Sequence, residues 1–166
     1  MRAFMTTGTA HFLKNVTDSH PTIHFYFMKS GVSTLVYYES EKKKSIFVSG
    51  RSYDILANYG FMNKTGFVVM DSVPVMEDGM AVFEERFNKQ LSTIQHAKGI
   101  LAARLLKQVK GNTYIIFTQW ETERHYTDWQ KSSAYEQLTF SKLARLPAYF
   151  AERPFTSTYY MLKEDD

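Results

Sequence analysis

The sequence predicts an α+β fold built from two halves, each a mixture of short strands and amphipathic helices. Short runs of β-branched and aromatic residues alternate along the chain with segments of helical periodicity, and the order of segments in the second half is similar to that in the first. The chain has 166 residues, of which 44% are hydrophobic. This is enough apolar material for one domain or for two small ones.

The first half, residues 1–62, is expected to form a loosely ordered α+β unit. Four runs predict strands: 2–7, 22–28, 33–39 and 45–50. Two segments predict helices: 9–20, which Pro21 ends, and 51–60, which ends at Gly60. The Lys29-Ser30-Gly31 segment between the second and third strands indicates a β-hairpin.

The second half, residues 66–163, shows the pattern more clearly. Four runs predict strands: 67–75, 100–109, 113–120 and 157–163. One helix is predicted after Asp78, its expected N-cap, because Met80, Phe83, Phe87 and Leu91 recur at helical spacing. A second helix follows Thr122 as N-cap. The resulting order is strand, helix, strand, strand, helix, strand, which is the ferredoxin-like split βαβ unit.

Two such units in one chain have a consequence for assembly. The sheet of a single unit leaves a face and its edges exposed unless something covers them. Here the first half is expected to cover those surfaces within the chain, with residues 60–66 as the joint. We therefore predict two fused ferredoxin-like halves and a monomer.

Composition narrows the classes of function. Cysteine is absent, which excludes disulfide bonds and thiolate metal sites. No secretory signal or run of roughly 18 apolar residues is present, so a cytoplasmic protein is expected. The net charge is only +3, and Lys42–Lys44 reads as a charged turn, so no nucleic acid partner is expected. A metal site is not expected: His20 and His24 are four residues apart, but Pro21 lies between them, so no helix presents both. The other histidines are His11, His96 and His125.

Residues 121–135, ETERHYTDWQKSSAY, place Trp129 in an amphipathic helix on a stripe with Tyr126 and Ser133. This stripe is either core packing or the wall of a pocket for a flat aromatic ligand. Asp71 and Ser72 interrupt an apolar strand. A buried carboxylate is costly without a partner, so Asp71 requires a hydrogen-bond donor, a strand end or a functional role.

The second half resembles a known domain family, the antibiotic-biosynthesis-monooxygenase domain, which is of the dimeric α+β-barrel type. The resemblance lies in residues 111–135, in the EERFNKQ segment that precedes them, and in the split βαβ order of the elements. More narrowly, they resemble the IsdG-type haem-degrading monooxygenases, especially the longer HmoB form, whose additional N-terminal half opens with a segment similar to TTGTAHFL here. The chain is also similar in length and in both halves to the target of RNAIII-activating protein (TRAP) family.

The resemblance implies a site and shows where this chain departs from it. Haem degradation in the family uses an Asn that donates toward iron-bound oxygen, a Trp against the porphyrin, and a His that ligates iron. Trp129 matches the Trp. The Asn position falls at Asp71, or at Ser72 if the alignment shifts by one, and the His position falls at Thr139. An ionised Asp only accepts hydrogen bonds, and Thr is a poor ligand for haem iron.

Three functions follow as hypotheses. The first is a haem-binding, haem-degrading monooxygenase-like protein with altered or lost catalytic residues, for which haem is substrate and cofactor and an unidentified electron donor is required. The second is a non-catalytic TRAP-like protein of stress response or signal transduction, with possible peripheral membrane association. The third is a cofactor-independent oxygenase of small aromatic compounds.

Overall fold

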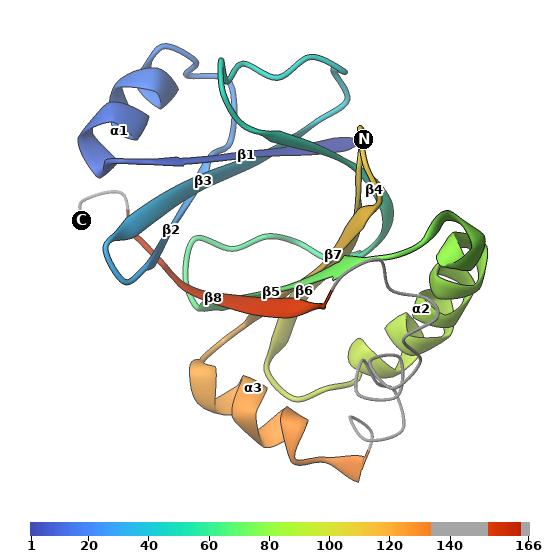
Figure 1. Cartoon of the computed structure of the whole chain (residues 1–166). Helices are drawn as coiled ribbons and strands as arrows, with labels where there is room; N and C mark the ends of the chain where they lie inside the picture. Colours follow the sequence, from blue (N-terminus) through green and yellow to red (C-terminus); the bar gives the residue numbers. More distant parts are fainter. Residues whose placement is uncertain (134–152, 164–166) are drawn as a thin grey trace.

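The strands close into one antiparallel barrel in residues 1–133 and 153–163, which are the residues that the computed structural model describes (Figure 1). The order around the barrel is β1-β3-β2-β8-β5-β7-β6-β4. The elements of the first half are β1 (Arg2–Gly8), α1 (Ala10–Asp18), β2 (Tyr26–Ser30), β3 (Ser33–Ser40) and β4 (Arg51–Gly60). Those of the second half are β5 (Phe67–Pro74), η1 (Glu77–Gly79), α2 (Met80–Ile94), β6 (Ile100–Gln108), β7 (Thr113–Trp120), α3 (Glu123–Gln130) and β8 (Phe155–Met161).

The strands of each half lie together, and the two groups have the same internal order. Around the barrel, the second half contributes β8-β5-β7-β6 and the first half then contributes β4-β1-β3-β2. When the strands of each half are counted along the chain, both groups have the order fourth, first, third, second. The groups join where β4 pairs with β6 and where β2 pairs with β8. The second half has the complete strand, helix, strand, strand, helix, strand order that the sequence predicts.

The first half differs from its prediction in two segments. Residues 51–60 form strand β4 and not a helix, and residues 45–50 contain no strand. Tertiary pairing overrides local propensity here, because β4 hydrogen-bonds to β1 on one side and to β6 on the other. Tyr53 and Ile55 pack into the barrel, and after a bulge Ala57 and Tyr59 pack outside it. The first half therefore lacks the second helix of a full ferredoxin-like unit.

The helix starts agree with the sequence in part. Thr9 caps α1 by accepting a hydrogen bond from the backbone N–H of Phe12, and Thr122 caps α3 in the same way from His125. The prediction that Asp78 caps α2 is wrong. A turn of 3-10 helix occupies residues 77–79, and the N-cap of α2 is Gly79, without a side-chain hydrogen bond.

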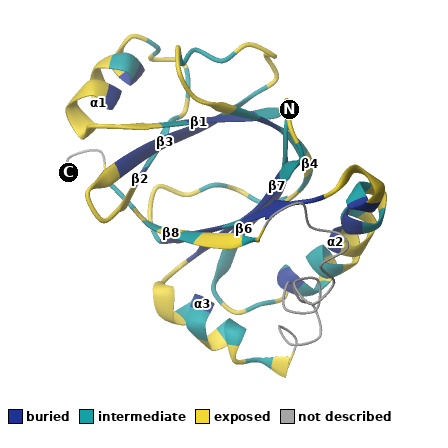
Figure 2. Cartoon of the chain, viewed as in Figure 1, coloured by how far each residue is buried: buried dark blue, intermediate teal, exposed yellow. Residues whose placement is uncertain are grey.

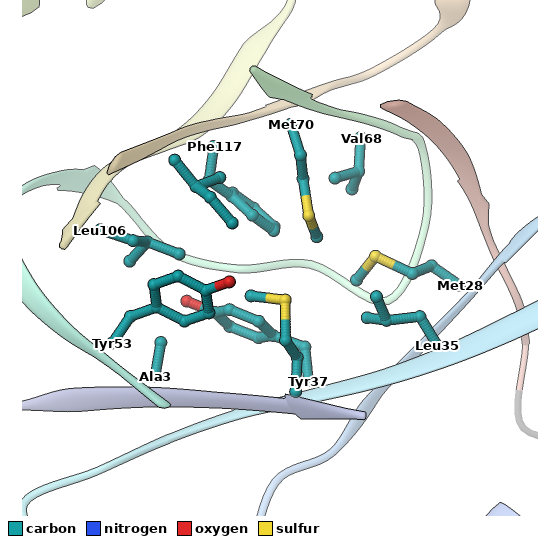
Figure 3. Packing of buried hydrophobic residues seen from close by; sticks show 11 residues of the cluster. Ala3, Met28, Leu35, Tyr37, Tyr53, Val68, Met70, Leu106 and Phe117 are labelled. Atoms are coloured by element: carbon teal, nitrogen blue, oxygen red, sulfur yellow. The ribbon is translucent and has the colours of Figure 1, made fainter. Parts of the chain in front are cut away.

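Two apolar layers lie on the two faces of the second half's strands. Along β5, Val68 and Met70 point into the barrel, whereas Val69 and Val73 point outward beneath the helices. Figure 3 shows the interior layer, in which Met70 and Phe117 of one half meet Tyr37 and other side chains of the other half. Most of β3 and β7 is accordingly buried, whereas much of α1 and α3 is exposed (Figure 2).

A buried ion pair joins the halves inside the barrel. The Nε of Arg104 on β6 lies 2.9 Å from a carboxylate oxygen of Glu39 on β3, and the hydroxyl of Tyr37 donates to the same oxygen at 2.7 Å. Arg104 also donates to the backbone carbonyls of Tyr59 and Gly60. The guanidinium is thus satisfied although its side chain is only 6% exposed.

Among the described residues, no helix is both long and apolar enough to span a membrane.

Candidate functional site

Trp129 lies on the side of α3 that faces the outer surface of the sheet. Its ring centroid is 5.2 Å from that of Trp120 on β7 and 6.4 Å from that of Tyr126. It packs against both outer clusters, one beneath α2 and the other beneath α3. Unlike Trp120, which is fully buried, Trp129 is only half-buried. Part of the indole is therefore accessible to a ligand.

Trp120 is the residue at this site that the sequence reasoning missed. It ends β7, its indole N–H donates to the hydroxyl of Thr118 at 2.9 Å, and its ring supports those of Trp129 and Tyr126. Strand alternation could have predicted its position, because Trp120 is an even number of residues from Ile116, which also faces outward.

The stripe of Tyr126, Trp129 and Ser133 on α3 is shorter than predicted, since Ser133 lies beyond α3 and is exposed.

Asp71 shares the outer face with Trp129. It lies opposite Ile116 on β7, and directly paired residues of antiparallel strands project from the same face. Its hydrogen-bond partner is Thr156 on β8, whose hydroxyl donates to Oδ1 at 2.5 Å. Burial raises the pKa of Asp71 above its ordinary value of 3.8, and the hydrogen bond from Thr156 opposes that increase.

Ser72 projects from the opposite face of the sheet. It has the parity of Val68 and Met70, it is buried, and it lies opposite Ile115, which belongs to the interior cluster. The structure therefore brings Asp71 to the face that carries Trp129 and places Ser72 inside the barrel. Thr139, the position of the family's iron ligand, lies outside the described residues.

His125 is occupied at the start of α3. Its Nδ1 lies 2.7 Å from the hydroxyl of Thr122, and its Nε2 lies 3.9 Å from the carboxylate of Glu121. The ring also fills the space beside Gly99, where an added Cβ would lie 2.3 Å from it. Within the described part of the chain, no group of three or more His, Asp or Glu side chains is placed to hold a metal ion.

The outer face thus offers an accessible indole backed by a second indole, together with a partly buried carboxylate. These groups fit a flat aromatic ring, which stacks on aromatic side chains. They do not supply an axial ligand for the iron of a haem, because such ligands are typically histidine, cysteine, methionine or tyrosine side chains and not indoles or carboxylates.

Comparison with known proteins relates both the second half and the chain as a whole to characterised families. Residues 66–139 match the family described as antibiotic biosynthesis monooxygenase. The chain is 24% identical to a heme-degrading monooxygenase of Listeria monocytogenes over 138 residues, which are 83% of this chain and 82% of the relative. It is 26% identical to the signal transduction protein TRAP of Staphylococcus aureus over 159 residues, which are 96% of this chain and 93% of the relative.

Solved structures show the same fold. A major regulator of staphylococcal pathogenesis superposes with a TM-score of 0.87 at 23% identity, covering 98% of this chain and 100% of its own. The heme-degrading enzyme LmHde from Listeria monocytogenes superposes with a TM-score of 0.80 at 19% identity, with the same coverage. Residues 66–139 are therefore similar to an antibiotic biosynthesis monooxygenase domain, within a chain similar to both a heme-degrading monooxygenase and the TRAP signal transduction proteins.

Proposed function

We propose that the outer face of the second half, between the sheet and α3, binds haem through its porphyrin ring. The observation that carries this proposal is the position of Trp129, half-buried on α3 with its ring centroid 5.2 Å from that of the buried Trp120 and the two ring planes tilted by 39°. Trp120 supports Trp129 from behind, so the accessible indole is held in a fixed orientation. The similarity to a heme-degrading monooxygenase supports haem as the ring.

Ring opening is not part of this proposal. Asp71 stands where the resembling enzymes have a hydrogen-bond donor, and an ionised carboxylate only accepts. At the position of the iron ligand the sequence has Thr139, whose hydroxyl is a poor substitute for imidazole. We therefore propose a haem-binding protein that holds the ring by aromatic contact, and haem degradation is an activity to be tested separately.

A metal-free ring separates contact with the porphyrin from ligation of iron. The full chain is titrated with haem and with protoporphyrin IX, and binding is followed by the Soret band and by quenching of tryptophan fluorescence. Because the proposed contacts are to the ring, the two dissociation constants are expected to agree within severalfold. Haem binding without binding of the metal-free ring would contradict the proposal, because it would show that binding requires an iron ligand.

Ascorbate added to the haem complex under air then tests degradation. Persistence of the Soret band is expected for the wild-type chain. Asp71→Asn with Thr139→His restores both residue types of the resembling enzymes, so faster loss of the Soret band is expected in this double variant. Its loss at equal rates in both proteins would show that Asp71 and Thr139 do not limit the chemistry.

A second candidate function is signal transduction without catalysis or haem. The observation in its favour is the extent of the similarity to TRAP, which spans 96% of this chain. On this alternative Trp129 is packing alone, and neither haem nor protoporphyrin IX binds. Cofactor-independent oxygenation of a small aromatic compound has no observation of its own in support.

A further inference from the structure

A continuous series of aromatic rings leads from the candidate site to the surface. Trp129 contacts Trp120 at a centroid distance of 5.2 Å, and Trp120 contacts Tyr126 at 5.7 Å. Tyr126 lies 6.0 Å from Phe67 on β5, and Phe67 lies 5.1 Å from Tyr160 on β8. The rings come from four separate elements, so the sheet and α3 together build this series, which we call the aromatic path.

The outer end of the aromatic path is an exposed phenol with a proton acceptor. Tyr160 is 55% exposed, and its hydroxyl donates a hydrogen bond to the carboxylate of Glu123 in the first turn of α3. This hydrogen bond raises the pKa of Tyr160, so the phenol is protonated at neutral pH. A tyrosine that loses an electron also releases its proton, and Glu123 is placed to receive it.

The inner rings differ from the outer one in exposure and in hydrogen bonding. Trp120 is fully buried and donates its indole N–H to Thr118, and Tyr126 is 9% exposed and accepts from Gln130. Phe67 is buried and is not readily oxidised. It therefore serves as the contact between the two oxidisable rings of Tyr126 and Tyr160. Tyr160 is thus the member of the path that combines an oxidisable ring, solvent contact and a carboxylate acceptor.

We propose that the aromatic path carries oxidising equivalents from Trp129 to Tyr160, where a small-molecule reductant at the surface removes them. Tryptophan and tyrosine give electrons only to strong oxidants. The path therefore discharges a one-electron oxidant of the peroxide-derived class at the candidate site, and it does not reduce a ferric ion there. This role goes beyond ligand binding, because it removes an oxidant that would otherwise damage the site.

The electrons and protons balance in three steps. The oxidant takes one electron from the indole of Trp129 and is itself reduced by one electron. Trp120 then gives an electron to Trp129, and Tyr126 gives one to Trp120. Tyr160 finally gives an electron to Tyr126. As it does so, the phenolic O–H bond of Tyr160 breaks, an O–H bond forms on the Glu123 carboxylate, and a phenoxyl radical remains. A thiol or ascorbate gives a hydrogen atom to the phenoxyl oxygen, and Glu123 returns its proton to solvent.

Pulse radiolysis of the ligand-free full chain tests the path without any dependence on haem. Azide radicals oxidise tryptophan in preference to tyrosine, and the chain has only two tryptophans. The absorption of the tryptophanyl radical is expected to decay at a rate independent of protein concentration while that of a tyrosyl radical rises. A nitroso spin trap followed by peptide mapping is expected to place the adduct on Tyr160.

Two variants and a matched control identify the residues. Tyr160→Phe is expected to abolish the trapped adduct, and Glu123→Gln to slow its formation severalfold, because an amide is a poor proton acceptor. Tyr159→Phe is the control, since Tyr159 is the next residue on β8 but packs against the barrel interior, and it should leave yield and rate unchanged. An unchanged tyrosyl radical in Tyr160→Phe, or an adduct on another tyrosine of the wild-type chain, would overturn the proposal. Haem binding can fail or succeed independently of either result.

Discussion

At the scale of single residues, Asp71 determines the chemistry available on the outer face. It is a partly buried carboxylate between the apolar residues Val69 and Val73. The hydrogen bond from the hydroxyl of Thr156 reduces the free-energy cost of burying this charge. The sequence predicted that Asp71 needs a partner, and strand alternation was sufficient to place it on one face of the sheet. The identity of the partner could not be predicted, because Thr156 lies 85 residues further along the chain and meets Asp71 only through the pairing of β5 with β8.

The raised pKa of Asp71 predicts a pH-dependent stability. A carboxyl group whose pKa is higher in the folded state stabilises the fold at low pH, and this contribution is lost as pH rises through the folded-state pKa. Asp71→Asn removes the buried charge, so the variant is expected to be more stable than the wild type at neutral pH. The difference should shrink toward zero below the ordinary value of 3.8.

Denaturant unfolding of the wild type and of Asp71→Asn, from neutral pH to below 3.8, measures the difference in stability. Thr156→Val provides an opposite change, because it removes the donor that favours the ionised carboxylate and should lower stability at neutral pH. A stability difference between Asp71→Asn and the wild type that is independent of pH would contradict this account of Asp71.

At the scale of elements, local patterns predicted the second half well and the first half less well. The described strands and helices of residues 67–161 carry strong periodicity and appear in the predicted order, although the predicted N-cap of α2 at Asp78 was wrong. The strand at residues 51–60 was missed although Tyr53, Ile55, Ala57 and Tyr59 recur at the period of a strand. A bulge after Ile55 turns these side chains from the inside of the barrel to the outside, and the pairing with β1 and β6 fixes the strand.

Gly60, read from sequence as the end of a helix, instead ends β4 with a positive φ of 69°. A Cβ added there would lie 2.2 Å from the carbonyl oxygen of Leu101, whereas one added at Gly31, where φ is 59°, meets nothing within 4 Å. Gly31→Ala is therefore expected to cost about 1 kcal/mol of backbone strain. Gly60→Ala adds a collision with backbone and should cost about 3 kcal/mol or more. Equal losses of unfolding free energy in the two variants would show that the approach to Leu101 is unimportant.

At the scale of the whole molecule, each half completes the sheet of the other. The pairing of β4 with β6 and of β2 with β8 leaves no open edge in the barrel of the described residues, and the monomer stays a prediction. Sequence periodicity predicted most of the strands, including β6 and β8 at the edges of the second half. It could not identify the pairing between halves, because those contacts join residues far apart in the chain.

The ion pair between Glu39 and Arg104 is a polar contact inside the barrel that joins the two halves. Removing one partner leaves the other charge buried, so Glu39→Leu is expected to lower the free energy of unfolding by about 3 kcal/mol. The double variant with Arg104→Leu should lose less than this single variant, because no unpaired charge remains. Asp128→Ala, which breaks the exposed pair with Arg124, is the control and should stay within about 0.5 kcal/mol. A double variant less stable than Glu39→Leu would contradict the assignment.

The central claim is that Trp129 forms the wall of a haem site, and equilibrium titration of the full chain with haem tests it most directly. Wild-type protein and Asp128→Ala, which alters the exposed neighbour of Trp129, are expected to give a saturable Soret shift at one haem per chain. Trp129→Ala is expected to remain folded by circular dichroism and to bind haem at least tenfold more weakly, a loss of about 1.4 kcal/mol. The absence of a saturable shift in the wild type, or equal affinity in folded Trp129→Ala, would contradict the claim.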